Sequence, residues 1–134
     1  MTAAVIKPEL EYRPFWLVSG YLLLIVILVL SLIPLGPVGD IMMWTDKFLH
    51  AGCFLFLMIW FCGLFPRSSH LRISVLLMVY GGLIELLQYL TGFRSFELAD
   101  MVADVVGILF GAMLASLGLW RWCEYLEKRI IAFK

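Results

Sequence analysis

Four long runs of apolar residues constrain this chain more than any other feature, and they occupy more than half of its 134 residues. A helix needs about 20 residues to cross a hydrocarbon core of about 30 Å, and each run has about that length. We predict membrane spans at residues 15–33, 48–65, 73–90 and 101–120. The sequence therefore predicts an all-α integral membrane protein, a four-transmembrane-helix bundle that forms a single domain over residues 1–134.

The composition agrees with this reading, because 63% of the residues are hydrophobic and only 15% are charged. The charged residues lie in short intervals between the runs and show no helical spacing, so they indicate loops. Pro34 and Pro66 end the first two runs, and Gly92 is suited to cap the third. The formal net charge is zero and there is no basic tract, which argues against a nucleic-acid partner.

The distribution of Lys and Arg predicts the orientation of the spans. Eight of the ten lie in the N-terminal segment, the loop between the second and third spans, and the C-terminal tail, whereas only Lys47 and Arg94 lie on the other side. Short cytoplasmic loops are enriched in Lys and Arg. We therefore expect a multi-pass protein of the cytoplasmic (inner) membrane with both termini in the cytoplasm.

Small residues recur every four positions in the fourth run, at Ala103, Gly107, Gly111 and Ala115. Such a stripe lets a neighbouring backbone approach closely, either within one chain or between two, so a homo-oligomer is a possible partner arrangement. The tail at residues 121–131 combines aromatic and basic residues and is predicted to be a short interfacial helix. The three cysteines form no CxxC motif and are interpreted as small buried residues.

Ionisable and amide residues gather near the outer ends of three predicted spans. In chain order they are Asp46, Lys47, His50, Glu85, Gln88, Arg94, Glu97, Asp100 and Asp104. Spacings of three and four residues place members of a pair on one helix face. The topology brings all nine to one membrane face, where Lys47 and Arg94 are the natural partners of the acids. Ionisable residues inside a span indicate a functional site by default.

The order of these residues resembles the VanZ-like family, which is named for a teicoplanin-resistance protein. The resemblance covers about residues 45–115 and consists of Asp46-Lys47-Phe48-Leu49-His50, then Glu85-x-x-Gln88, then Arg94, Asp100 and a glycine-rich helix. It implies a small bacterial membrane protein connected with lower susceptibility to glycopeptide antibiotics. One position departs from the pattern, because Asp104 stands where the family often has Asn. The additional carboxylate favours cation binding.

The resemblance and the polar residues together predict an outward-facing pocket that binds or modifies a lipid-linked envelope component. Candidate catalytic groups are His50, Glu85, Asp100 and Asp104; candidate ligand-binding groups are Asp46, Lys47, Gln88 and Arg94. His50 with carboxylates suits a divalent cation, but the chain has no tight metal motif such as HExxH, so no residue is assigned to a metal, and the sequence identifies no cofactor.

Three alternatives to an enzyme remain. The same residues would serve a binding or accessory protein that grips a membrane lipid without turnover. They would also serve a bundle in which polar contacts only hold the helices together. An ion pathway is less favoured, because the inner half of each span is apolar.

Overall fold

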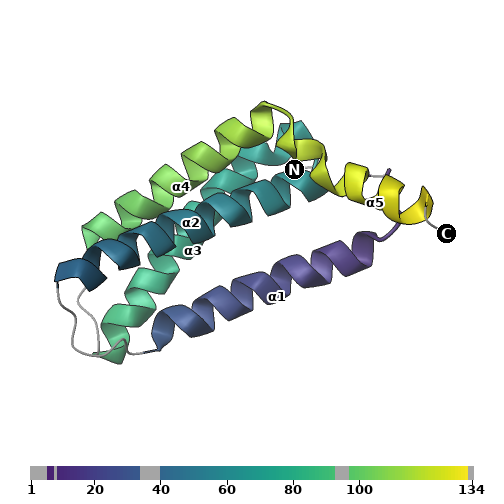
Figure 1. Ribbon diagram of the computed structural model, residues 1–134. Helices are drawn as coiled ribbons and strands as arrows, with labels where there is room; N and C mark the ends of the chain where they lie inside the picture. The colour runs from purple at the N-terminus through teal and green to yellow at the C-terminus, as the bar shows by residue number, and fades with distance from the viewer. Residues whose placement is uncertain (1–5, 8, 34–39, 93–96, 133–134) are drawn as a thin grey trace.

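The computed structural model describes residues 6–7, 9–33, 40–92 and 97–132, with the backbone alone for residues 40–44. Over these residues every regular element is a helix (Figure 1). The elements are α1 (Arg13–Leu32), α2 (Asp40–Leu64), the 3₁₀ turn η1 (Arg67–Ser69), α3 (His70–Thr91), α4 (Leu98–Ser116), the 3₁₀ turn η2 (Leu119–Arg121) and α5 (Trp122–Ala132).

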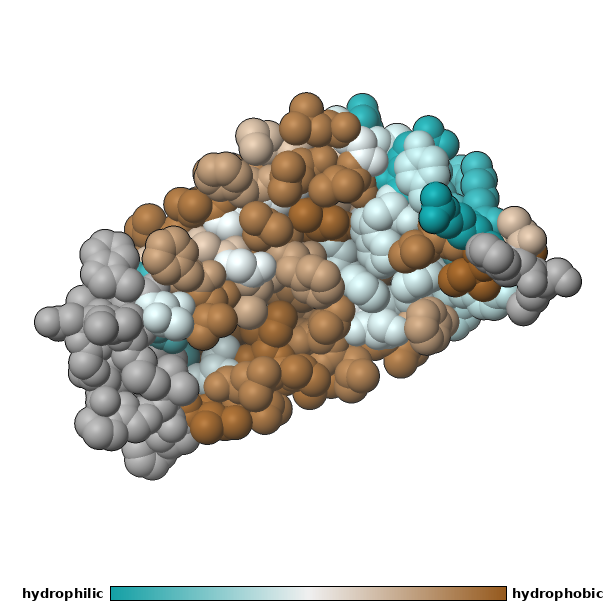
Figure 2. Space-filling view, viewed as in Figure 1, coloured by the Kyte–Doolittle hydropathy of each residue, from teal (hydrophilic) through white to brown (hydrophobic). Residues whose placement is uncertain are grey.

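Four helical segments are long and apolar enough to cross a membrane, namely Arg13–Leu32, Thr45–Leu64, Arg67–Thr91 and Leu98–Ser116. They expose large apolar side chains such as Leu22, Leu76 and Leu109 along their length. Figure 2 shows the result as a broad hydrophobic band between the grey atoms at one end and a hydrophilic region at the other. A surface of this kind is stable against lipid and not against water. The predicted all-α, four-span membrane architecture is therefore confirmed.

All four long helices begin before the predicted spans, and α4 also ends earlier. Helix α2 begins at Asp40, before the predicted residue 48, and α4 begins at Leu98 and ends at Ser116, whereas residues 101–120 were predicted. The prediction followed the apolar runs, but a helix begins and ends where a cap or turn sets its limits, and not where the apolar run does. The predicted cap of α3 is confirmed, because Gly92 has a left-handed φ of 72° and its N–H bonds to the Tyr89 carbonyl oxygen.

Helices α2 and α4 form the closest pair in the bundle, and glycines make this approach possible. A Cβ atom added at Gly111 would lie 2.8 Å from the Leu55 carbonyl oxygen, and one at Gly107 would overlap the Ala51 carbonyl group. The small-residue stripe therefore packs within one chain, against the backbone of α2. This contact fixes the register of α2 against α4 and places His50 opposite the first turns of α4.

Helix α1 lies at the edge of the bundle (Figure 1) and buries only Trp16 and Gly20. Two hydrogen bonds from α3 hold it: the Tyr80 hydroxyl donates to the Leu24 carbonyl oxygen at 2.6 Å, and the Gln88 amide donates to the Ser31 carbonyl oxygen at 2.8 Å. In both contacts a side chain of α3 donates to a backbone carbonyl oxygen of α1. Because few side chains of α1 are buried, space remains between this helix and α2.

Candidate functional site

A cluster of charged side chains lies where α2 and α4 begin and α3 ends. We call it the polar cluster; its members are Asp46, Lys47, His50, Glu85, Glu97, Asp100 and Asp104. Lys47 joins α2 to α4, because its ammonium group donates to Glu97 Oε2 at 2.9 Å and to Asp100 Oδ1 at 2.8 Å. Asp100 also places a negative charge in the first turn of α4, at the positive end of the helix dipole.

His50 and Asp104 form a buried pair one helical turn deeper. The distance between His50 Nδ1 and Asp104 Oδ1 is 2.9 Å, and both side chains are buried. The second oxygen of Asp104 faces Gly81 of α3, where an added Cβ atom would lie only 2.5 Å from it. When Asp104 is ionised it can only accept a hydrogen bond, so Nδ1 then donates to it, and Nε2 of a neutral ring keeps its lone pair. This arrangement suits either a general base or a metal ligand.

Glu85 is fully buried, and a contact with the backbone at the start of α4 joins it to the polar cluster. Its Oε2 accepts a hydrogen bond from the Glu97 backbone N–H at 3.3 Å. Its Oε1 and Asp104 Oδ2 are buried without a hydrogen-bond partner among the described residues. A buried carboxylate oxygen without a donor costs free energy, so the described residues hold more acceptor capacity here than their own donors use.

The structure separates the remaining predicted residues. Asp46 lies with His50 and Asp100, and one ligand atom from each of the three lies within 4.8 Å of the others. Gln88 instead turns to α1 and binds the Ser31 carbonyl oxygen, so it serves a helix contact in this structure. Arg94, predicted to bind a ligand, lies outside the described residues. The polar cluster thus brings together Asp46, Lys47, His50, Glu85, Asp100 and Asp104.

A groove of about 310 Å³ between α1 and α2 reaches this cluster. Most of its walls are apolar, and Asp46 and His50 are the charged or titratable groups at its polar part. The lining residues are Ile27, Leu30, Ser31, Ile33, Asp46, Leu49, His50, Cys53 and Phe54. An apolar groove with a few polar groups at one place is the usual form of a site for an amphiphilic small molecule.

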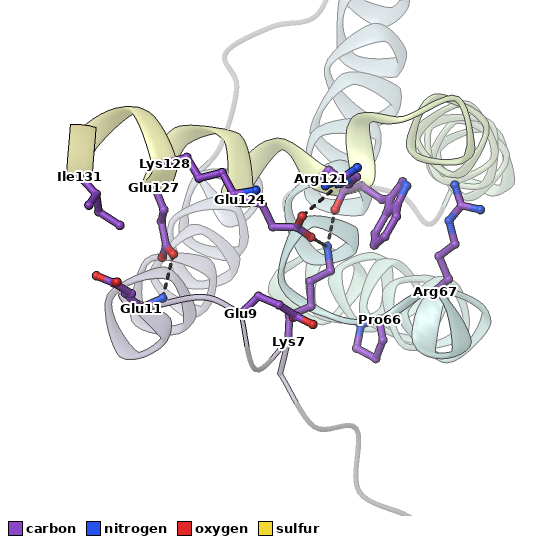
Figure 3. Close-up of a pocket in the computed structure, with 11 residues that line it drawn as sticks. Lys7, Glu9, Glu11, Pro66, Arg67, Arg121, Glu124, Glu127, Lys128 and Ile131 are labelled. Carbon is purple, nitrogen blue, oxygen red and sulfur yellow. Dashed lines mark hydrogen bonds and ion pairs between the residues drawn. The ribbon is translucent and has the colours of Figure 1, made fainter. Parts of the chain in front are cut away.

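A second group of charges joins the N-terminal segment to α5 at the opposite end of the bundle (Figure 3). We call Lys7, Arg121, Glu124 and Glu127 the terminal cluster. Lys7 donates to the Trp120 carbonyl oxygen at 2.5 Å and to Glu124 Oε1 at 3.2 Å, and Arg121 donates to Glu124 Oε2 at 3.1 Å. Burial tends to raise the pKa of Glu124, but these two cations outweigh it and hold the pKa below its ordinary value.

Glu127 is buried and caps α1 from the other end of the chain. It accepts hydrogen bonds from the backbone N–H groups of Glu11 and Tyr12, at 2.8 and 3.0 Å, and from Trp16 Nε1 at 2.6 Å. The cap residue Tyr12 has no side-chain cap of its own, so Glu127 supplies the acceptor that this helix terminus needs. Beside it, burial raises the pKa of the Cys123 thiol to about 12.

Sequence reasoning missed the terminal cluster. The tail was interpreted from its aromatic and basic residues as a helix at the membrane surface, yet two of its acidic residues bind the N-terminal segment of the chain. One weak signal was present, because Glu127 follows Cys123 by four residues and so shares the buried face of α5. A pocket of about 720 Å³ lies here, bounded by Lys7, Arg67, Trp120 and Glu124 among others.

Fold and site together define a polytopic membrane protein of four spans with buried ionisable groups near both ends of its bundle. The comparison with protein families agrees: the VanZ/LLP1 family model matches residues 5–121. The chain belongs to the VanZ/LLP1 family. Comparisons with curated proteins and with solved structures gave no match.

Proposed function

We propose that this protein acts in cell-envelope homeostasis or glycopeptide antibiotic tolerance, by binding or modifying a lipid-linked envelope component in the polar cluster. The observation that supports this most directly is the groove between α1 and α2, which has a mostly apolar lining that includes Asp46 and His50. An acyl or prenyl chain fits the apolar part, and a polar head group reaches the charged part.

The proposed orientation places the polar cluster at the outer face of the bacterial inner membrane. Lys7, Arg67 and Arg121 all lie at the terminal end of the bundle, and the excess of Lys and Arg at that end favours a cytoplasmic location. Both termini are then cytoplasmic. A C-terminal green fluorescent protein fusion should fluoresce and a C-terminal alkaline phosphatase fusion should be inactive; the opposite pair of results would reverse the orientation.

The groove can be tested by filling it. Leu30 lines the groove, whereas Leu22 lies on the same helix, is similarly exposed, and does not line it. We expect Leu30→Trp to weaken the binding of a polyprenyl phosphate to purified protein about tenfold or more, and Leu22→Trp to leave it unchanged. Native mass spectrometry measures the bound lipid. Equal binding by the two variants would show that the groove does not hold the lipid.

The role of the buried pair is tested in cells. His50→Gln removes the imidazole from the polar cluster, and His70→Gln is the matched control because it changes the other histidine of the chain, at the start of α3. Expressed in a glycopeptide-sensitive bacterium, the wild type and His70→Gln should raise the inhibitory concentration of teicoplanin. His50→Gln should fail to do so while its membrane level stays normal.

The alternative is a structural or accessory protein whose polar cluster only holds the helices together. The contacts of Lys47 with Glu97 and Asp100 favour it, since they tie α2 to α4. In that case His50→Gln should lower the amount of folded protein and change nothing else. Turnover of a lipid substrate that Glu85→Ala abolishes would favour an enzyme over a binding protein.

A further inference from the structure

We propose that Asp46, His50 and Asp100 bind a divalent cation of the manganese or zinc type at the polar end of the groove. One ligand atom from each of these three residues lies within 4.8 Å of the others. Ligand atoms around a tetrahedral zinc ion are about 3.4 Å apart, given bonds of 2.0–2.2 Å. Asp46 is half-buried, and we expect side-chain rotation to bring the three ligand atoms to that spacing when the ion binds.

The donor set has the chemistry of a transition-metal site. One imidazole with two carboxylates suits Zn²⁺ or Mn²⁺, whereas Mg²⁺ and Ca²⁺ favour oxygen alone. Lys47 engages Oδ1 of Asp100, but a carboxylate has two oxygens and the other is left for the ion. Asp46 and Asp100 come from different helices, so an ion between them would join α2 to α4.

Asp104 supplies the second shell that a metal-binding histidine normally has. Histidine ligands donate their other ring N–H to a carboxylate or carbonyl, which fixes the tautomer and the ring orientation. Asp104 Oδ1 lies 2.9 Å from His50 Nδ1, which leaves Nε2 as the nitrogen for the ion. Gly81 has no Cβ atom, which leaves the room that Asp104 Oδ2 needs in this position.

The charge at this end of the bundle also calls for a cation. Lys47 binds Glu97 and Asp100, and His50 pairs with Asp104. Even so, two buried carboxylate oxygens, Glu85 Oε1 and Asp104 Oδ2, have no hydrogen-bond partner within the described part of the chain. A divalent ion nearby would offset the negative charge of these buried acids, and the groove lined by Asp46 and His50 gives it an entry path.

The cation would bind an anionic head group directly, and this role rests on the proposed function. The cation site itself does not, so the two are tested separately. Purified protein is stripped with a chelator and titrated with MnCl₂ without added lipid, and electron paramagnetic resonance measures free and bound Mn²⁺. We expect one saturable site per chain, with the electron spin echo modulation that an imidazole nitrogen ligand produces.

Variants decide which histidine binds the ion. His50→Gln should abolish the nitrogen modulation and His70→Gln should keep it, and Asp104→Asn should weaken binding about 10–100-fold. Circular dichroism and gel filtration check that each variant is folded. If His50→Gln does not fold, Asp46→Asn, at a half-buried position, replaces it and should weaken binding at least as much as Asp104→Asn.

The inference is overturned by an absence of saturable Mn²⁺ binding, by nitrogen modulation that survives His50→Gln, or by unchanged affinity in Asp46→Asn. Lipid binding by the chelator-stripped protein would leave the proposed function standing without the cation. Mn²⁺ binding by a protein that binds no polyprenyl phosphate would leave the cation site standing without the proposed function.

Discussion

Replacing Glu127 by alanine should destabilise the protein more than any other single change in α5. The carboxylate accepts three hydrogen bonds, from the Glu11 and Tyr12 backbone N–H groups and from Trp16 Nε1. A hydrogen bond to a charged group contributes about 1.5–3 kcal/mol net, and the donors near the surface regain some of this from water. We therefore expect a loss of about 3–5 kcal/mol in the free energy of unfolding, most of it from the buried Trp16.

The assay is unfolding in mixed micelles by increasing sodium dodecyl sulfate, followed by tryptophan fluorescence. The signal comes from the region being tested, because Trp16 lies 5.4 Å from Trp122 and 6.0 Å from Trp60 between ring centroids. Lys128→Ala is the control, since Lys128 is the exposed neighbour of Glu127 on the same helix. Glu127→Gln keeps one acceptor oxygen, so its free energy of unfolding should lie between those of Glu127→Ala and Lys128→Ala. Equal stability of Glu127→Ala and Lys128→Ala would refute the proposed capping of α1.

Three further predictions use neighbouring or matched positions. Gly81→Ala should displace the buried aspartate that pairs with His50 and destabilise the bundle by about 1–3 kcal/mol in the same unfolding assay. Gly82→Ala is the control, because an added Cβ atom there would have no neighbour nearer than 3.9 Å, and it should be neutral or slightly stabilising. Gly107→Ala should push α4 away from α2 and lower the thermal midpoint, whereas Gly52→Ala, with no atom within 4 Å, should not. Cys123, with a pKa of about 12, should resist maleimide at neutral pH until the protein is unfolded, and rapid labelling of Cys123 in the folded protein, located by peptide mapping, would contradict its burial.

The architecture was predictable because a bilayer allows few solutions. A spanning segment must satisfy its own backbone hydrogen bonds, so an apolar run of about 20 residues is a helix almost by necessity. The glycine stripe was equally informative, since a small residue every fourth position marks a face where another backbone approaches. Gly107 and Gly111 do contact α2, although the spacing alone did not identify the partner helix.

The site was only partly predictable, because spacing gives a helix face and not the direction of a long side chain. Glu85 and Gln88 are three residues apart and both are buried, yet Glu85 binds the Glu97 N–H and Gln88 binds a carbonyl of α1. The terminal cluster was beyond the reach of local reasoning. Lys7 and Glu124 are 117 positions apart, and no periodicity relates residues at that separation.

The two ends of the bundle show why cavity size alone is a poor guide to the site. The pocket at the terminal cluster, about 720 Å³, is the larger, but its buried acids are matched: Glu124 by two cations and Glu127 by three donors. Such groups stabilise the fold and leave little capacity for a ligand. The groove at the polar cluster is smaller, about 310 Å³, yet two buried carboxylate oxygens there, Glu85 Oε1 and Asp104 Oδ2, have no partner within the described residues. Uncompensated buried charge is costly unless a ligand, a proton or a cation completes it, and this imbalance is the physical reason to assign function to the end that holds His50.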